Sequence, residues 1–476
     1  MKVSRVVAAG AIPLVFVIVL LIGLIRGRTS FLNDPGTFWH LRLGRTILAD
    51  HDVPRTDALT YTRAGRPWVD QSWAFDAILA LVVDRRGWSG AIALTAVVLA
   101  WLYATLARGL VHDGASPIAA GVVAVVAAGI GSIHFLIRPH LFTFAFVLWT
   151  LGACRALHRG QSGPIRWLPL VMIAWANVHG GFLAGPVIVA TATIGEAVSG
   201  RWDADRRRKL KLFAASLAAC CVAPLVNPYG IGLYRHVGGL LVTKGVTDLI
   251  MEYQSAPFGK PEARILEGVI LGLVALPVLG RGRPSRYELI HTLVWLHLAL
   301  NSIRHAPLFA FAAAPTMATL IDGVLSPDPP EEAPRRWWAF PALVTMILAV
   351  CVALRVPFGG PDPGKWPLAG LKLLDRQPVG DRLFHEQDWG GLIAVDCHPR
   401  RPTFIDDRFE LHGRDAILEY LAALEAGPAW DDLLAREKPR LVFIRPWRPL
   451  ANRLQRDPAH WDVVYRDDIA ILLRRK

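Results

Sequence analysis

Charged residues are scarce in this sequence. They make up 19% of the 476 residues, whereas hydrophobic residues make up 53% and the mean hydropathy is +0.35. A soluble protein carries about 25% charged residues. Because the apolar excess comes in blocks, the composition excludes an ordinary soluble domain and predicts a polytopic membrane protein.

Cysteines and the common catalytic motifs are also missing or few. Cys154, Cys220, Cys221 and Cys351 lie in apolar blocks and Cys397 stands alone, which excludes a disulfide framework and a cysteine-based zinc site. The sequence lacks a Walker A loop, a GxSxG elbow and an HExxH motif. Nucleotide hydrolysis, the α/β-hydrolase triad and zincin chemistry therefore lose their usual signatures.

Positive charge, by contrast, is in excess, with a net charge of +13. In a soluble protein this excess would suggest nucleic acid as a partner. Here lysine and arginine gather in short loops between apolar blocks, as the positive-inside rule requires. We therefore expect a lipid bilayer as the partner, and no nucleic acid.

Eleven apolar blocks are predicted to span the membrane. The first covers residues 6–25, about 20 residues, which suffices for a hydrocarbon core of about 30 Å. A cleaved signal peptide is the alternative for this block. The other predicted spans cover residues 89–110, 116–134, 140–157, 165–178, 181–198, 210–226, 264–280, 287–301, 306–322 and 338–356.

Four basic loops set the predicted orientation. They cover residues 155–166, 201–211, 281–288 and 326–336. If each loop is cytoplasmic, the N-terminus is cytoplasmic and the C-terminus lies outside. The apolar segment 72–86 is short for a span, and counting it as one would reverse these sides. We interpret it as a surface helix, within a first outer loop over residues 27–88.

The last 120 or so residues change character. After a linker rich in proline and glycine, "GGPDPGKWPLAG", come four short runs typical of strands, "GLIAVDC", "PTFIDDR", "LVFIRP" and "DIAILLRR". A helical pattern covers residues 413–438. We therefore predict a membrane module over residues 1–356 and a soluble extracytoplasmic α/β domain over residues 357–476.

Unusual polar residues fall at the predicted outer ends of the spans. These ends are "HFLIRPH", "WANVHGG", "NPYG" and "NSIRHAP", which carry histidine, arginine or asparagine, and "MEYQSAPF", which carries a glutamate. Ionisable groups at membrane depth are costly and usually functional, so we predict a common cavity. Capping of helix ends and snorkelling are the alternative for each residue alone. The substrate-binding candidates in these ends are Asn177, His179, Asn227, Tyr229, Glu252 and Tyr253.

The residue types in this predicted cavity suggest a chemistry. Arginine forks suit phosphate oxygens, which makes Arg138 and Arg304, with His140 and His305, candidates for binding a donor phosphate. Carboxylates can accept a proton from a sugar hydroxyl or an amine. A membrane cavity that holds both groups suits a lipid-linked phosphate donor beside a polar acceptor.

The first outer loop supplies the carboxylates. Asp34 and His40 lie in "NDPGTFWH", directly after the first span, while Asp57 and Asp70 lie further along the loop. We predict Asp34, His40 and Asp70 as catalytic residues and Asp57 as substrate-binding. The alternative for "NDPG" is a simple turn, in which aspartate and proline serve the backbone.

Residues 1–356 resemble the GT-C superfamily of polyprenyl-phosphate-dependent glycosyltransferases in their architecture. They share a first span, a long outer loop with an aspartate near its start, and many further spans. In that superfamily the loop aspartate commonly serves as the catalytic base, and Asp34 matches it. The paired acidic residues of several members are absent, since Asn33 and Pro35 flank Asp34. The elements "WANVHGG", "NPYG" and "DWGG…DDR" also resemble those of a group of bacterial membrane proteins.

This resemblance implies a glycosyltransferase in the inner (plasma) membrane that acts on its extracytoplasmic face. The donor would be a polyprenyl-phosphate-linked sugar, and the acceptor a glycan, a lipid or a protein. A divalent cation, Mg²⁺ or Mn²⁺, is left open. The alternatives are a transporter or flippase for lipid-linked or polar substrates, and a non-catalytic assembly protein for cell-envelope polysaccharide.

One further cluster lies in the predicted C-terminal domain. The stretch "FIDDRFELHG" carries Asp406, Asp407, Arg408 and Glu410, which could bind a glycan or a cation. The alternative is an ionic cluster at a strand end that holds the domain together.

Overall fold

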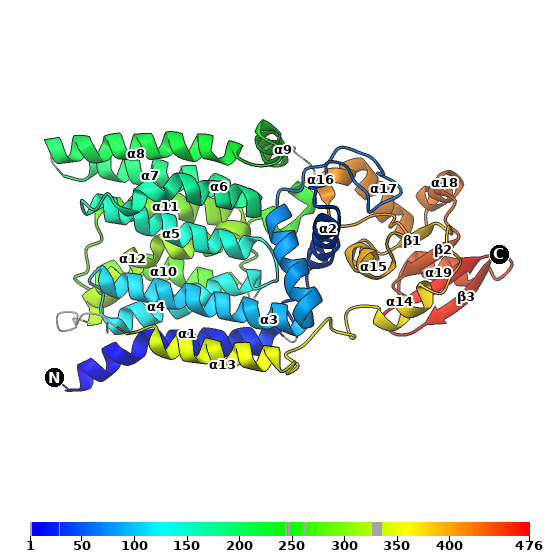
Figure 1. Ribbon diagram of the computed structural model, residues 1–476, viewed down its shortest axis with the longest axis horizontal. Helices are drawn as coiled ribbons and strands as arrows, with labels where there is room; N and C mark the ends of the chain where they lie inside the picture. The colour runs from blue at the N-terminus through cyan, green and yellow to red at the C-terminus, as the bar shows by residue number, and fades with distance from the viewer. Residues whose placement is uncertain are drawn as a thin grey trace. The chain divides into compact units, whose positions relative to one another are not determined.

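The computed structural model describes residues 2–27, 29–200, 202–242, 245, 247–260, 263–325 and 336–476. The chain is mostly helical, with a small sheet near the C-terminus (Figure 1). It divides into two compact units, which are described separately. The predicted basic loop 326–336 lies, except for its last residue, outside the described residues.

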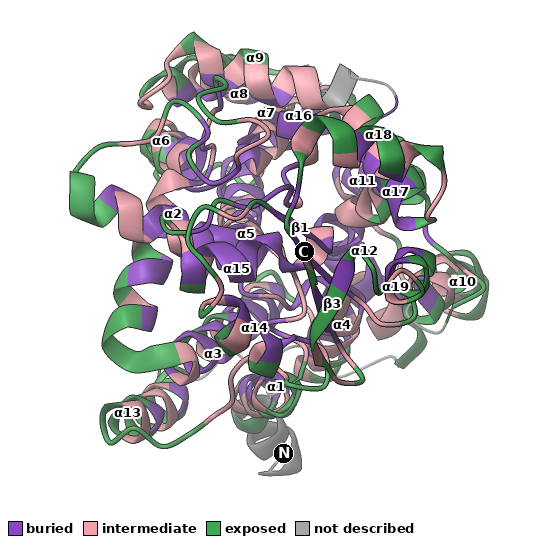
Figure 2. Ribbon diagram, turned by 90° about the vertical axis from the view of Figure 1, so that its right-hand side faces the viewer, coloured by how far each residue is buried: buried purple, intermediate pink, exposed green. Residues whose placement is uncertain are grey.

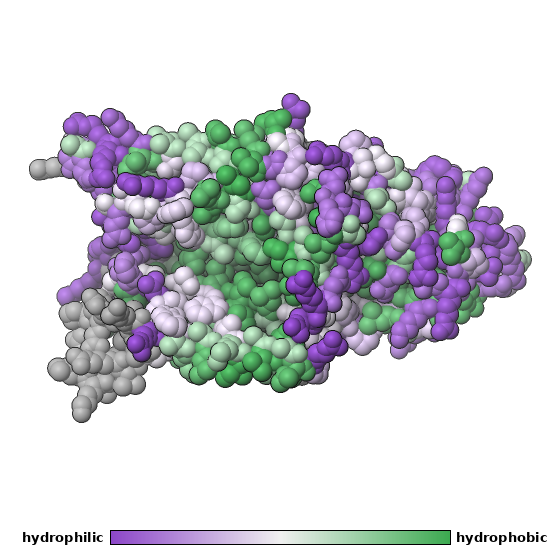
Figure 3. All heavy atoms as spheres, in the orientation of Figure 1, coloured by the Kyte–Doolittle hydropathy of each residue, from purple (hydrophilic) through white to green (hydrophobic). Residues whose placement is uncertain are grey.

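Unit 1 comprises Met1–Gly27, Ser89–Ile231 and Ile250–Phe358. Its helices are α1 (Lys2–Gly27), the second part of α3 (Trp73–His112), α4 (Pro117–Gly131), α5 (His140–His158), α6 (Leu168–Val178), α7 (Ala184–Val198), α8 (Ala204–Val222), α10 (Arg264–Leu279), α11 (Arg286–Asn301), α12 (Ala306–Leu325) and α13 (Ala339–Ala353). Hydrophobic side chains gather over these helices (green in Figure 3).

Six helical segments among the described residues are long and apolar enough to cross a membrane, as in a multi-pass membrane protein. They are Gly10–Gly27, Trp73–His112, Pro117–His134, His140–His158, Gly180–Val198 and Ile303–Leu325. The prediction of eleven spans is therefore confirmed only in part. Each of the other five predicted spans does contain a helix, in α6, α8, α10, α11 and α13.

Length and charge explain why these five helices fall short. A span needs about 20 residues at 1.5 Å per residue, whereas α6 has 11 residues, α13 has 15, and α10 and α11 have 16 each. Helix α8 is long enough, but its first turns read "ADRRRKLK", so its polar start lowers its hydropathy.

The predicted surface segment 72–86 is helical from Trp73 onward and forms the first part of α3. The helix is interrupted at Gly87, where φ is 66° and ψ is −174°. A side chain rarely adopts this backbone conformation, so glycine suits the break. The residues up to Trp88 belong to unit 2, and Ser89 begins the part that belongs to unit 1.

Unit 2 comprises Arg28–Trp88, Gly232–Leu249 and Gly359–Lys476. Its first outer loop and its C-terminal residues thus form one body, whereas the sequence assigned residues 27–88 to the membrane module. Its elements are α2 (Gly36–Asp50), the first part of α3, α9 (Ile231–Val242), α14 (Leu368–Leu374), β1 (Leu383–His385), α15 (Gly390–Cys397), α16 (Phe409–His412), α17 (Arg414–Leu424), α18 (Pro428–Glu437), β2 (Leu441–Ile444), α19 (Pro449–Gln455), β3 (Trp461–Arg466) and β4 (Ile471–Arg475).

The sheet of unit 2 has the strand order β1-β2-β4-β3. Strand β1 pairs with β2 in parallel, and β4 pairs antiparallel with both β2 and β3. Alternate residues of β2 enter two different core clusters: Val442 packs with Trp430, and Phe443 packs with Trp389. Because successive strand side chains point to opposite faces, the sheet is covered on both sides.

Two of the four predicted strands are confirmed, and two predictions were wrong. The runs "LVFIRP" and "DIAILLRR" contain β2 and β4. The run "GLIAVDC" is helical and lies in α15, which is mostly buried (purple in Figure 2). The run "PTFIDDR" is irregular, apart from one bridge between Thr403 and Thr60.

Candidate functional sites

The first candidate site is a polar group in unit 1, at the ends of several helices. We call it the end group; it consists of Arg138, His140, His179, Glu252, Tyr253 and Arg304. Arg304 lies in the short helix Ile303–His305, and Tyr253 lies in the short helix Met251–Tyr253. The Arg304 guanidinium donates a hydrogen bond of 2.5 Å to the Tyr253 hydroxyl and lies 5.0 Å from the centre of its ring.

Hydrogen bonds also join the two short helices that carry these residues. The Ser302 hydroxyl donates to the Glu252 carbonyl oxygen at 2.9 Å. The Ile303 amide donates to the Gln254 carbonyl oxygen, also at 2.9 Å. These two hydrogen bonds to backbone carbonyl oxygens hold together segments about 50 residues apart, which carry Glu252 and Arg304.

The histidines of the end group are held by specific hydrogen bonds. His140 Nε2 donates to the His134 carbonyl oxygen at 2.6 Å. His179 Nδ1 lies 2.8 Å from the Thr143 hydroxyl, which in turn accepts from the Trp175 indole at 2.8 Å. This arrangement explains a glycine of "WANVHGG", because a Cβ atom at Gly181 would lie 2.7 Å from His179 Nδ1.

The charges of the end group interact with one another. Arg138 and Arg304 both act electrostatically on His140 and on His179. Burial disfavours the ionised Glu252, but Arg304 and Arg138 outweigh it and lower the pKa of Glu252. The structure thus brings together six of the predicted residues, and two guanidinium groups among histidines can bind a phosphate.

Three other predicted residues of unit 1 contact the backbone. Asn177 donates to the carbonyl oxygens of Ile173 and Val226, each at 2.8 Å. Asn227 holds the "NPYG" turn, because its side chain accepts from the Tyr229 amide at 2.7 Å and donates to the Pro224 carbonyl at 2.6 Å.

His305 belongs to the same class, since its Nδ1 lies 3.3 Å from the Leu298 carbonyl oxygen. These contacts stabilise turns and helix ends. The predicted roles of Asn177, Asn227, Tyr229 and His305 toward a substrate stay predictions.

In unit 2, Asp34 lies at the entrance to α2. Its Oδ1 accepts from the Gly36 amide at 2.7 Å, and its carbonyl oxygen accepts from the Thr37 amide at 3.4 Å. The Lys365 ammonium donates to the neighbouring Asn33 carbonyl oxygen at 2.5 Å. The Asp34 side chain is partly buried and fits the turn that the sequence offers as an alternative; its catalytic role stays a prediction.

The other two predicted catalytic residues are buried in unit 2. His40 Nδ1 lies 2.6 Å from Asp76 Oδ1, and both side chains are buried. Asp70 is also buried; its Oδ1 accepts from the Ser72 amide at 3.1 Å. Burial raises the pKa of Asp70 to about 6, although the Ser72 hydrogen bond opposes this shift.

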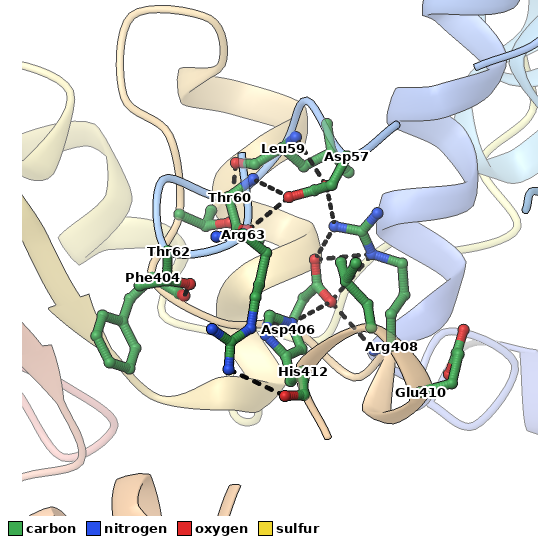
Figure 4. Close-up of polar contacts among 12 residues, drawn as sticks. Asp57, Leu59, Thr60, Thr62, Arg63, Phe404, Asp406, Arg408, Glu410 and His412 are labelled. Atoms are coloured by element: carbon green, nitrogen blue, oxygen red, sulfur yellow. Dashed lines mark hydrogen bonds and ion pairs between the residues drawn. The ribbon is translucent and has the colours of Figure 1, made fainter. Parts of the chain in front are cut away.

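The fourth predicted residue of the loop, Asp57, belongs to a buried ionic network (Figure 4). Its carboxylate accepts from the Thr60 hydroxyl at 2.6 Å and from the Arg408 guanidinium at 2.8 Å. Arg408 also donates to Asp406 at 2.6 Å, and His412 Nε2 lies 3.2 Å from the same Asp406 carboxylate. Burial disfavours the charge of Asp406, but Arg408 and His412 outweigh it and lower the pKa of Asp406.

Arg408 lies close to side chains from two of the sequence motifs of unit 2, "WVDQSW" and "NDPGTFWH", and "DWGG" packs against the second of them. Its guanidinium lies 4.8 Å from the ring of Trp68 in "WVDQSW" and 5.9 Å from that of Trp39 in "NDPGTFWH". A Cβ atom at Gly391 of "DWGG" would lie 2.9 Å from the Trp39 amide nitrogen. The described contacts of Asp406 and Arg408 thus match the structural alternative, a buried ionic cluster.

Sequence reasoning missed the partners of these residues. Asp76 holds His40, and no signal singles it out, since it lies in an apolar helix. Arg408 and Asp57 are 351 positions apart, so no local spacing connects them. Within the described ranges, no group of three or more histidine, cysteine, aspartate or glutamate residues could hold a metal ion.

Comparisons with known proteins add no assignment. No protein-family model matches the sequence, and no curated protein matches it either.

Proposed function

We propose that this protein is a membrane glycosyltransferase that moves a sugar from a polyprenyl-phosphate donor to an acceptor on the extracytoplasmic face. The observation that carries the proposal is the end group of unit 1. It holds two arginines, a tyrosine and two histidines within a set of helices that includes candidate membrane spans. Guanidinium groups in such surroundings suit the phosphate of a lipid-linked donor.

An apolar groove in unit 1 supports a lipid as the donor. It has a volume of about 320 Å³ and lies between α4, α10 and α12. Its walls are apolar, with two glycines on α10 that leave room; they include Val126, Ile265, Gly268, Gly272, Leu276 and Ile321. In a bilayer, such a groove would take a hydrocarbon chain.

The proposed roles follow the environments of the side chains. Arg138 and Arg304 bind the donor phosphate, and His140 and His179 line the same end group. Asp34 is the proposed base, because it is partly buried whereas Asp57 and Asp70 are buried. Asp57, Asp70 and His40 then hold unit 2 in shape.

The finer topology also belongs to this proposal. The five shorter helices complete an eleven-span, GT-C-like module in the inner membrane, with a cytoplasmic N-terminus and unit 2 outside. The basic loops between the helices favour this orientation. A reporter fused after Lys476 that is active only in the cytoplasm would overturn it.

Binding of a polyprenyl phosphate tests the proposed role of the arginines. The purified protein in nanodiscs should bind the lipid, and Arg138→Lys or Arg304→Lys should weaken binding, because a bidentate fork becomes a point charge. Arg208→Lys is the matched control, since Arg208 is exposed in the basic start of α8. Equal affinity in all three variants would contradict the assignment.

A further inference from the structure

One face of α11 carries three buried polar side chains, each one helical turn from the next. Tyr287, His291 and Trp295 are 2%, 3% and 1% exposed. Among the described residues, the Tyr287 hydroxyl, His291 Nε2 and Trp295 Nε1 have no hydrogen-bond partner. A buried polar atom without a partner is destabilising, and such atoms usually bind protein groups or ordered water.

The start of this face lies against a hydrogen-bonded pair, His158 and Glu196. The His158 ring stacks on the Tyr287 ring, with 4.1 Å between the centres and 15° between the planes. His158 Nδ1 lies 2.5 Å from the Glu196 carboxylate, which is buried. A Cβ atom at Gly195 would lie 2.9 Å from the Tyr287 ring, so the glycine lets α7 approach α11 closely.

The three polar atoms complement one another as donors and acceptors. His291 Nδ1 lies 3.1 Å from the Tyr287 carbonyl oxygen, to which it donates, so Nε2 of the neutral ring is an acceptor. The Trp295 indole is a donor, and the Tyr287 hydroxyl can be either. The centres of the Tyr287 and His291 rings lie 4.7 Å apart, so polar atoms on neighbouring rings of this face can share a water through hydrogen bonds of about 2.8 Å.

Other ligands fit this face less well. An anion would meet the lone pair of His291 Nε2 and the Glu196 carboxylate. A metal ion would lack ligands, since the described residues contain no suitable group of three. Water can both donate and accept, as this set of atoms requires.

We propose that Tyr287, His291 and Trp295 bind a file of internal water molecules in unit 1. The file begins beside the His158–Glu196 pair and extends along α11 to Trp295. It connects the protonatable pair with His291 through hydrogen bonds, so water reaches the interior of the helical unit from the His158 end. This inference is independent of the proposed glycosyltransferase activity.

Radiolytic footprinting of the full-length protein tests the proposal, because hydroxyl radicals formed from bound water oxidise buried side chains next to it. Trp295 and Trp175 form a matched pair: both are buried, and the Trp175 indole donates to Thr143. We expect Trp295 to be oxidised severalfold faster than Trp175. Equal rates would overturn the proposal, and this comparison needs no variant.

The substitution Tyr287→Phe gives a second test, because a hydrated and a water-free site predict different changes in the melting temperature. If the Tyr287 hydroxyl binds water, Tyr287→Phe loses hydrogen bonds and the melting temperature falls. If the hydroxyl has no partner at all, its removal leaves the melting temperature unchanged or raises it, which would overturn the proposal. Tyr420→Phe shows the cost of losing a known hydrogen bond, because the Tyr420 hydroxyl accepts from the Gln387 amide at 2.7 Å.

Discussion

Replacing Arg408 with methionine is expected to destabilise unit 2 severely. The substitution keeps a long apolar stem but removes the cation that donates to Asp57 at 2.8 Å and to Asp406 at 2.6 Å. Removing one partner of a buried ion pair costs about 3–5 kcal/mol, because the remaining charge stays buried. Loss of the cation–π contact with Trp68, at 4.8 Å, adds about 1–2 kcal/mol.

This effect is measured by heating the purified full-length protein and monitoring its unfolding through the proteolytic cleavage of unit 2. The matched control is Arg436→Met, because Arg436 pairs with Glu419 while 53% exposed, and surface pairs contribute only about 0–1 kcal/mol. Adding Asp57→Asn to Arg408→Met should restore part of the stability, since one uncompensated charge disappears. If Arg408→Met and Arg436→Met melt alike, the network does not stabilise unit 2 as argued.

Three further predictions concern the same two units. Asp70 has a pKa of about 6 in the folded protein, against an ordinary value of 3.8. Its contribution to stability is therefore complete below about pH 4 and is lost as the pH rises through 6, and the difference between the two pKa values corresponds to about 3 kcal/mol in the free energy of unfolding. Asp70→Asn should therefore melt higher than the wild type at pH 8 and alike at pH 4, and a lower melting temperature at pH 8 would contradict this. Gly391→Ala should lower the melting temperature, because the new Cβ would lie 2.8 Å from a carbonyl oxygen at the start of α2. Gly427→Ala is the control, since a Cβ there meets nothing within 4 Å. Equal melting temperatures of the two variants would refute the close packing at Gly391. Tyr253→Phe should weaken binding of a polyprenyl phosphate by releasing Arg304, and unchanged affinity would show that the Tyr253 hydroxyl does not position the guanidinium.

Local patterns in the sequence predict much of the secondary structure. Long apolar runs become helices, and the short, continuously buried runs at β2 and β4 become strands. The run "GLIAVDC" misleads because a short apolar segment fits a buried strand or a buried helix equally well. Packing decides the outcome, since Gly390 and Gly391 let α15 approach Asp406 and α2 closely.

The end group of unit 1 is the part of the candidate site that the sequence predicts best. The positive-inside rule places the ends of the spans that carry Arg138, His179 and Arg304 on one side, and the structure brings these residues into electrostatic contact. Contacts in unit 2 could not be predicted, because Asp57 reaches Arg408 across 351 positions. A loop carboxylate that the sequence suggests for substrate binding can therefore have a structural partner elsewhere in the chain.

Sugar transfer by the purified protein in nanodiscs tests the central claim most directly. With a radiolabelled polyprenyl-phosphate sugar and an envelope extract as acceptor, the wild type should transfer label. Asp34→Asn keeps the shape of the side chain but loses its basicity, so turnover should fall by about 10²-fold or more while the donor still binds. Transfer by Asp34→Asn at the wild-type rate would contradict the role of this base, and a wild type that binds no polyprenyl phosphate and transfers no sugar would contradict the proposed function itself.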